Sequence, residues 1–283
     1  MPVISRALRY GARMACVIAV AFAFAGAASA QDTLEKIKKS GKVTVGTEAA
    51  FPPFEMVKDG KIIGYGKDII DYIVADMKVE LVQLDVPFQG IFPGLLAGKF
   101  DFVATALLMN ETTTKKFAFT MPFAEGTSSF AKRKGDESMK RVEDLNGKIV
   151  ATQLGTGSEK IMRAVNEKFR AEGKGGFELK LFTSMPEAYL ALANRQVDAV
   201  TSLLASLRAL EARQPKVYEV VGPVIAGREY LGWACRPEDI KLRDYLSSKI
   251  KELRDSGKLA EMQQKWFGFT TELPDSGVPP GGI

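Results

Sequence analysis

The sequence predicts an α/β protein built from two similar lobes. Three observations indicate this class: 46% of the 283 residues are hydrophobic, short apolar runs alternate with helical patterns, and one pattern occurs twice. The repeated pattern is a helix, a polar turn and a strand that contains an aspartate, in "FPGLLAGKFDFVAT" and again in "YLALANRQVDAVTS". Alternating strands and helices favour mostly parallel sheets. The repetition favours two related lobes over one doubly wound domain.

The first 30 residues are predicted to be a cleaved signal peptide and not part of the fold. Three arginines precede an apolar run from Met14 to Ala25, and the small residues "ASA" follow it. The run is too short to favour an uncleaved membrane anchor, and Cys16 has no lipobox around it. We expect the mature chain to begin at Gln31, which lowers the formal charge from +5 to +2.

In the first half, a helix in "TLEKIKKSGK" leads to a buried strand at Val43–Thr47. In "EAAFPPFE" two prolines argue against regular structure, and a hairpin-like turn is predicted at Asp59-Gly60. Apolar residues at helical spacing then predict a helix over 66–77. A strand in "VELVQL", a short helix in "GIFPGLLAGKF" with a glycine stop, and a buried strand in "DFVATALL" complete this half.

The second half repeats this order. A strand in "GKIVAT" and a glycine-rich turn lead into a helix in "LGTGSEKIMRAVNEKF". A strand in "FELKLF", a helix in "MPEAYLALANRQ", a strand running into a helix in "VDAVTSLLASLRALEA" and a strand in "VYEVVG" follow. The chain ends with a strand in "REYLGWACR", a long helix with leucine and isoleucine on one face, and a last helix in "GKLAEMQQKWFG".

The composition excludes several function classes. The chain has no histidine, which excludes His-ligated metals, histidine acid–base chemistry and Ser-His-Asp triads. Cys235 is the only cysteine of the expected mature chain, so no internal disulfide is expected, and its apolar run "LGWAC" indicates buried packing. No basic block with interleaved aromatics suggests nucleic acid. No cofactor is expected, because neither "LGTGSE" nor "GYG" completes a nucleotide-binding motif.

Five motifs in a fixed order carry a resemblance to a known family. They are "GTEAAFPPFEMVKDGKIIGYGKDI", "GIFPGLLAGKFDFVAT", "FAFTMPF", "VATQLGTGSE" and "KLAEMQQKWFG". Together they resemble the family 3 periplasmic solute-binding proteins, the polar amino-acid receptors of ABC importers, over about Leu34 to Gly268. The resemblance implies the type II periplasmic binding protein fold, in which two Rossmann-like lobes joined by a two-strand hinge close around one solute.

The resemblance also implies lobe limits. The first lobe would hold residues 31–126 and 228–283, and the second lobe residues 127–227. Two extended crossovers, near Thr127–Phe130 and Val221–Ala226, would form the hinge.

One predicted binding element is the glycine-rich turn before the helix of the second half. Thr156, Gly157 and Ser158 can present free amide groups at a helix N-terminus, which suits an anion. The alternative is an ordinary capped helix start with Ser158 or Thr156 as the N-cap.

Glu48, Phe51 and Phe88 are predicted to line the ligand-binding site from the first lobe. Glu48 and Phe51 follow the carboxyl end of the first strand, where α/β sheets bind ligands. The resemblance implies that Glu48 contacts a distal ligand group, that Phe51 covers the ligand and that Phe88 is a second aromatic wall. The alternative for these residues is a packed loop.

The resemblance places the end of a cleft-lining strand at Thr105, Ala106 and Leu108. It places the family's carboxylate-binding arginine at Thr113 and its ammonium-binding aspartate at Leu203. Both charged partners of an amino acid are therefore replaced, and burying an unpartnered charge is costly. We expect a ligand other than a free α-amino acid in the usual pose, and poor binding of arginine, glutamine and histidine.

Nearby residues leave alternatives open. Lys115 or Lys116 could supply the missing cation, although a solvated helix face is the stronger interpretation. The run "NETTTKK" is predicted to hold a helix cap at the cleft.

The leading interpretation is a periplasmic receptor, with no enzymatic activity, that binds a small polar solute and delivers it to an ABC permease in the inner membrane. We expect a monomer and an amino acid or an amino-acid derivative as the solute. One alternative is a dehydratase of the cyclohexadienyl type with Glu48 as the acid, which the missing arginine argues against. Another is a ligand-sensing receptor for signalling.

Overall fold

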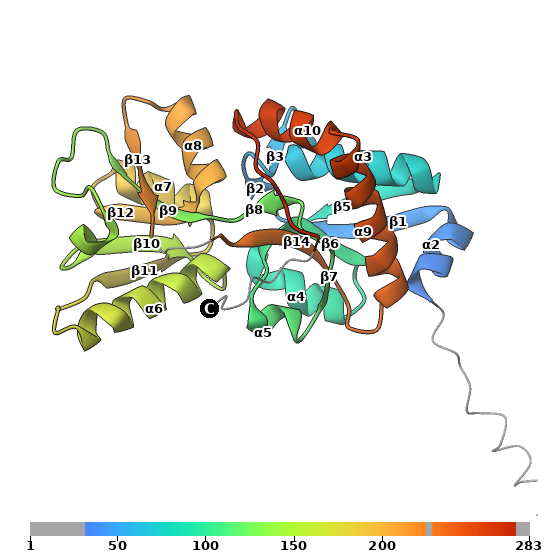
Figure 1. The fold of residues 1–283 in the computed structure, drawn as a ribbon, viewed down its shortest axis with the longest axis horizontal. Coiled ribbons are helices and arrows are strands. Elements are labelled where there is room, and N and C mark those ends of the chain that lie inside the picture. The colour runs from blue at the N-terminus through green and yellow to red at the C-terminus, as the bar shows by residue number, and fades with distance from the viewer. Residues whose placement is uncertain (1–31, 225–227, 276–283) are drawn as a thin grey trace, which may run out of the picture.

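A computed structural model describes residues 32–224 and 228–275. The described chain forms two lobes, each built on one sheet with helices on both faces (Figure 1). The predicted signal peptide, Gln31, most of the Pro/Gly-rich tail and the end of the second predicted crossover at Ala226 lie outside the described residues.

We call the part that contains the N-terminal sheet lobe 1. Its strand order is β5-β1-β6-β14-β7, and β8 also pairs with β14. The strands are β1 (Lys42–Thr47), β5 (Glu80–Asp85), β6 (Phe102–Leu108), β7 (Ala118–Phe119), β8 (Ala124–Glu125) and β14 (Tyr230–Cys235). The helices are α2 (Thr33–Ser40), α3 (Tyr65–Met77), α4 (Phe88–Leu96), α5 (Glu111–Thr114), α9 (Ile240–Asp255) and α10 (Lys258–Phe267). In Figure 1, α3 and α10 lie above this sheet and α4 and α5 below it.

We call the other part lobe 2, with strand order β11-β10-β12-β9-β13. The strands are β9 (Ser128–Arg133), β10 (Ile149–Gln153), β11 (Glu178–Phe182), β12 (Ala199–Leu203) and β13 (Tyr218–Pro223). The helices are η1 (Val142–Leu145), α6 (Gly157–Ala171), α7 (Met185–Ala193) and α8 (Leu204–Arg213). Helices α7 and α8 cover one face and α6 the other (Figure 1).

The expectation of mostly parallel sheets is only half right. Strands β1, β5 and β6 are parallel, as are β10, β11 and β12. The strands that follow a passage between lobes, β9 and β14, pair antiparallel with β12 and β6. Each enters its sheet directly and not through a crossover helix, and only a parallel neighbour requires such a helix. The sheets are therefore mixed.

The prolines of "EAAFPPFE" do not exclude all regular structure around them, which corrects the sequence prediction. A small antiparallel sheet joins β2 (Ala50–Phe51), β3 (Glu55–Lys58) and β4 (Lys61–Ile63). The two prolines lie in the turn between β2 and β3, so no ladder hydrogen bond is lost. The predicted turn at Asp59-Gly60 is confirmed, with φ values of 52° and 73° that suit a two-residue hairpin.

The repeated sequence pattern corresponds to repeated hydrogen bonds. In lobe 1, the Asp101 carboxylate accepts from the amide of Thr44 at 2.9 Å. In lobe 2, the Asp198 carboxylate accepts from the amide of Ile149, also at 2.9 Å. Each aspartate thus ties the start of the third parallel strand of its lobe to the central one. The echo in the sequence therefore reflects two lobes with the same local architecture.

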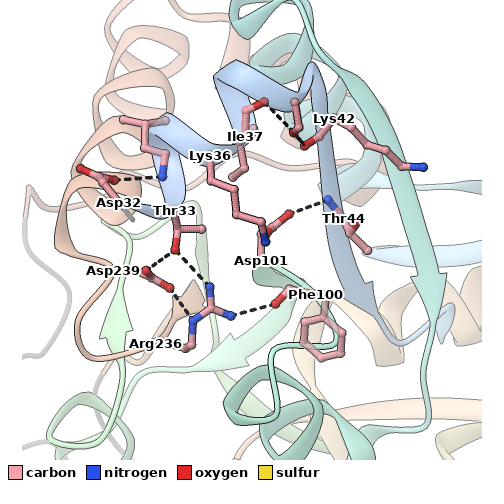
Figure 2. A network of polar contacts seen from close by, with 12 residues as sticks. Asp32, Thr33, Lys36, Ile37, Lys42, Thr44, Phe100, Asp101, Arg236 and Asp239 are labelled. Atoms are coloured by element: carbon pink, nitrogen blue, oxygen red, sulfur yellow. Dashed lines mark hydrogen bonds and ion pairs between the residues drawn. The ribbon is translucent and has the colours of Figure 1, made fainter. Parts of the chain in front are cut away.

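The segment after β14 is fastened to lobe 1 by a buried polar network (Figure 2). The Arg236 guanidinium donates to the Phe100 carbonyl at 2.9 Å and pairs with Asp239 at 2.8 Å. Thr33, at the start of α2, donates its hydroxyl to Asp239 at 2.5 Å. The beginning and the end of the described chain are therefore joined within one lobe.

The chain passes between the lobes twice, through 126–127 and through 224–229, of which 225–227 are outside the described residues. The Gly126 amide donates to the Glu229 carbonyl at 2.7 Å, and the Ser128 hydroxyl donates to the Glu229 carboxyl at 3.3 Å. The two passages therefore lie side by side. Burial raises the pKa of Glu229 to about 7.

Cys235 lies in β14 with its side chain fully buried, and burial raises the pKa of its thiol. The sequence interpretation of a packing residue is thereby confirmed. Among the helices of the described residues, none is long and apolar enough to cross a membrane.

Candidate ligand-binding site

A small cavity lies between the two lobes, next to the carboxyl ends of the parallel strands. Residues from both lobes line it. They are Glu48, Phe51, Phe88, Ala106 and Leu108 from lobe 1, and Gln153, Thr156, Gly157, Ser158, Met185, Ser202 and Leu203 from lobe 2. This is the edge at which open α/β sheets bind ligands.

Most of the residues selected from the sequence lie around this cavity. The structure brings together Glu48, Phe51, Phe88, Ala106, Leu108, Thr156, Gly157, Ser158 and Leu203. They come from segments as far apart as 48 and 203 in the sequence. Whether a ligand contacts them stays a prediction.

Thr105 is the first of two selected residues that do not line the cavity. Its hydroxyl donates to the Glu55 carboxyl at 3.1 Å, and both side chains are fully buried. Because side chains alternate along a strand, Thr105 points away from the face that Ala106 presents to the cavity. Burial raises the pKa of Glu55 well above its usual range.

Thr113 is the second, and it closes a helix cap. The Asn110 side chain accepts from the amides of Thr112 and Thr113 at 3.1 Å, and the Asn110 amide donates to the Thr113 hydroxyl at 3.2 Å. This capping box confirms the helix cap predicted for "NETTTKK". The Thr113 hydroxyl lies 3.5 Å from the Leu108 carbonyl, so position 113 lies next to the wall of the cavity.

Glu48 and Gln153 meet across the cleft. The Gln153 amide nitrogen donates to the Glu48 carboxyl at 2.5 Å, and Glu48 is only 5% exposed. Burial, with a smaller contribution from Asp85, raises the pKa of Glu48 to about 7 against the opposing effect of the hydrogen bond from Gln153. The single carboxyl of the cavity wall therefore changes charge near neutral pH.

Sequence reasoning missed Gln153, Met185 and Ser202. For Gln153 a signal was available in the internal repeat, because "TE" ends the first strand of lobe 1 and "TQ" ends the matching strand of lobe 2. The Thr47 and Thr152 hydroxyls donate to equivalent carbonyls, at 2.9 and 3.1 Å. The residues after these threonines are therefore equivalent, and they meet at the cleft.

Part of the N-terminus of α6 is capped by its own segment. Thr156 is the N-cap, and its hydroxyl accepts from the Glu159 amide at 3.3 Å. The Glu159 carboxylate accepts from the Gly155 amide at 2.7 Å, which places a negative charge at the positive end of the helix. The N-cap is therefore Thr156, one of the two caps considered from the sequence, and an anion at the amides of Gly157 and Ser158 stays a prediction.

Leu108 occupies the approach to this helix. A Cβ atom added to Gly157 would lie 2.5 Å from Leu108 Cδ1 and 2.8 Å from Leu108 Cβ. The leucine of lobe 1 therefore packs directly against the backbone of lobe 2, and only glycine fits at this contact.

The cavity wall carries no cationic side chain among its described residues. Lys115 is exposed and pairs with Glu111, in agreement with the solvated helix face, and Lys160 donates to the Thr112 hydroxyl at 3.0 Å. Over 32–224 and 228–275, no group of three potential metal-binding side chains occurs.

The space between these side chains is small. The volume open to the centres of water molecules is about 30 Å³, which is room for about two waters. Surface hollows elsewhere are larger, such as one of about 510 Å³ along 114–121 and α9, but they belong to a single lobe and are open to solvent. A metabolite can enter the cavity between the lobes only when the lobes separate.

Known proteins share the sequence pattern of this chain. The profile of the bacterial extracellular solute-binding proteins, family 3, matches residues 43–269. The chain is 27% identical to the L-arginine-binding protein of Pseudomonas aeruginosa over 234 residues, which cover 80% of this chain and 88% of the relative.

Two solved structures have the same architecture. A mutant of ArgBP from T. maritima superimposes with a TM-score of 0.73 at 32% identity, covering 83% of this chain and 99% of the other. An ancestral amino acid-binding protein, described as a precursor of cyclohexadienyl dehydratase, superimposes with a TM-score of 0.74 at 28% identity and the same coverage. This agreement confirms the predicted two-lobed fold class and the resemblance carried by the five motifs. The chain belongs to the bacterial extracellular solute-binding proteins, family 3.

Proposed function

We propose that this protein is the substrate-binding receptor of an ABC importer, and that a small polar solute binds in the cavity between its lobes. The observation that carries the proposal is the wall of that cavity, to which both lobes contribute side chains. A ligand held between two lobes stabilises their closed arrangement, and the closed arrangement is what a partner can recognise.

Partners and location follow from family membership. The receptor would be exported to the periplasm through cleavage after residue 30, act as a monomer and deliver its solute to a permease in the inner membrane. Family membership supports export. The three arginines followed by an apolar run within the first 30 residues also support it. The limits of the lobes, 31–126 with 228–283 and 127–227, and the hinge between them belong to the same proposal.

The solute would be an amino acid or a derivative of one. Relatives named for arginine and for glutamate and aspartate support this class. The sequence resemblance implies a departure from a zwitterion site, because it aligns Leu203 with the ammonium-binding aspartate and Thr113 with the carboxylate-binding arginine. We therefore expect a derivative.

The direct test is mass spectrometry of the small molecule released when the purified mature protein is mildly denatured. We expect a polar metabolite other than a standard amino acid, and arginine, glutamine and histidine to bind weakly in calorimetry. Recovery of a standard amino acid, or micromolar affinity for one of these three, would contradict the reading of Thr113 and Leu203.

A dehydratase is the second candidate, because the cavity contains a carboxyl with a pKa of about 7 and one solved relative is a precursor of such an enzyme. A general acid needs a pKa near the working pH. The described lining residues contain no arginine or lysine to bind the substrate carboxylates, which makes this candidate the weaker one. Turnover of a prephenate-type acid would establish it, and loss of turnover in Glu48→Gln would assign the acid.

Lobe closure should depend on Gly157. We expect Gly157→Ala to weaken ligand binding by at least about tenfold, because the new methyl group would overlap Leu108 across the cleft. Each lobe should still fold, since the overlap is between lobes. Calorimetry with the co-purified solute measures the affinity, and small-angle X-ray scattering measures closure.

Gly175→Ala is the matched control, because a Cβ atom there meets nothing within 4 Å. Adding Leu108→Ala to Gly157→Ala should restore closure by removing the overlap. Normal affinity in Gly157→Ala, or no recovery in the double variant, would show that the lobes do not close through this contact.

A further inference from the structure

The charge inside the cavity has one sign. Glu48 is the only ionisable side chain among the described lining residues, and the others are apolar or neutral. In a cavity this small, between two protein lobes, charges interact far more strongly than in bulk water. A ligand cation next to Glu48 would be stabilised, whereas a ligand anion would be repelled and would lose its hydration without a partner.

The end of the cavity that could hold an anion is blocked. Leu108 packs on Gly157, so its side chain fills the space in front of the first turn of α6. Two amides at this helix start, those of Gly155 and Glu159, already donate to side chains of the same segment. The Glu159 carboxylate also compensates the partial positive charge at this end of the helix. A ligand carboxylate would meet the Leu108 side chain there, and no cationic side chain among the described lining residues would pair with it.

The remaining walls suit an apolar body and a cationic head. Leu203 is 3% exposed and Met185 is 3% exposed, and both face the cavity from lobe 2. Phe51 and Phe88 line the lobe 1 side. Aromatic faces attract cations, and they also pack well against hydrocarbon.

We infer that the ligand is a small protonated amine that carries no carboxylate. Its N–H groups bind the Glu48 carboxylate beside Gln153, and its apolar body packs between Leu108 and Leu203. This inference rests on the proposed receptor function and names the ligand class for the same site. A decarboxylated amino acid has this chemistry, so the derivative expected above is an amine.

Matched pairs that differ only by the carboxylate test the inference. The pairs are agmatine and arginine, cadaverine and lysine, isoamylamine and leucine, and phenethylamine and phenylalanine. Isothermal titration calorimetry at pH 8 on the mature protein, freed of its co-purified ligand, measures each affinity. We expect at least one amine to bind at least about tenfold more tightly than its parent, because no cationic side chain among the described lining residues can pair with a buried carboxylate.

Two variants assign the effect to the carboxyl. Glu48→Gln keeps the size and the acceptor for Gln153 but removes the charge, so amine affinity should fall by at least about tenfold. Glu111→Gln is the control, because this exposed carboxylate pairs with Lys115 outside the cavity and its loss should leave affinity unchanged.

The outcomes separate this inference from the receptor function. If a parent amino acid binds as tightly as its amine in every pair, the amine inference is overturned and the receptor function stands. If no amine binds and mass spectrometry identifies another solute, the amine inference is also overturned and the receptor function stands. If no compound binds and no small molecule co-purifies, both fail. Amine binding that survives Glu48→Gln also overturns the inference.

Discussion

The variant Leu108→Thr, Thr113→Arg, Leu203→Asp is expected to bind arginine at least about 100-fold more tightly than the natural protein. It places a cation for the carboxylate at position 113, next to the cavity wall, and an acceptor for the ammonium at Leu203. Each charge-assisted hydrogen bond contributes about 1.5–3 kcal/mol, and a 100-fold gain needs about 2.7 kcal/mol. Calorimetry with arginine measures the gain.

Leu108 decides whether the two charges suffice. Its side chain fills the space in front of Gly157, so the double variant Thr113→Arg, Leu203→Asp should gain much less than the triple variant. Leu203 is also the N-cap of α8 and makes no side-chain cap bond, so aspartate there should stabilise the helix start and offset its burial.

Two controls separate the effect of the new charges from the effect of helix capping and from the effect of where the cation is placed. Leu203→Asn in the triple background still caps the helix but lacks the charge, and should lose most of the gain. Thr112→Arg in place of Thr113→Arg puts the cation on an exposed neighbour and should also fail. A folded triple variant that binds arginine no better than these controls would show that other walls of the cavity have moved.

The second large effect is a loss of closure as pH rises in the ligand-free protein. In the closed arrangement burial raises the pKa of Glu48 from 4.5 to about 7, whereas an open cleft would hydrate the carboxyl and return it toward 4.5. Below pH 4.5 the group is neutral in both arrangements. Between pH 4.5 and 7 the open form loses its proton first, so the ratio of closed to open falls as pH rises and becomes constant above 7.

The difference in pKa corresponds to about 3 kcal/mol, or roughly a 300-fold change in that ratio. Small-angle X-ray scattering at pH 5 and pH 8 should show a larger radius of gyration at pH 8. The titratable groups that interact with Glu48 are Asp85, Glu55 and Tyr189, and Gln153, its hydrogen-bond partner, does not titrate.

Glu48→Gln should remove most of this pH dependence. Glu229 is a second buried carboxyl with a pKa of about 7, and it lies where the chain passes between the lobes. Glu229→Gln is therefore the matched comparison, and it should leave most of the response in place. A response that is unchanged in Glu48→Gln and lost in Glu229→Gln would assign the effect to the passages and not to the cavity.

The sequence predicted the parts of this protein that local patterns control. Apolar spacing predicted a helix over 66–77, which the structure has at Tyr65–Met77, and the cap predicted for "NETTTKK" is a capping box around Asn110. The repeated strand with its aspartate predicted two similar lobes, because the same pattern of residue types forms the same hydrogen bond in both. These features depend on residues close together in the chain.

Only the tertiary structure decided which side chains face the cavity and in which direction the strands pair. Alternation along β6 turned Thr105 toward Glu55 and Ala106 toward the cavity, and the direct passage of β9 and β14 between lobes made both sheets mixed. The sequence also left open whether the start of α6 is a cap or an anion site. The structure supplies the Thr156 cap, the packing of Leu108 on Gly157 and the pairing of Glu48 with Gln153. The last two contacts join residues of different lobes, which lie far apart in the chain and meet only when the whole protein folds.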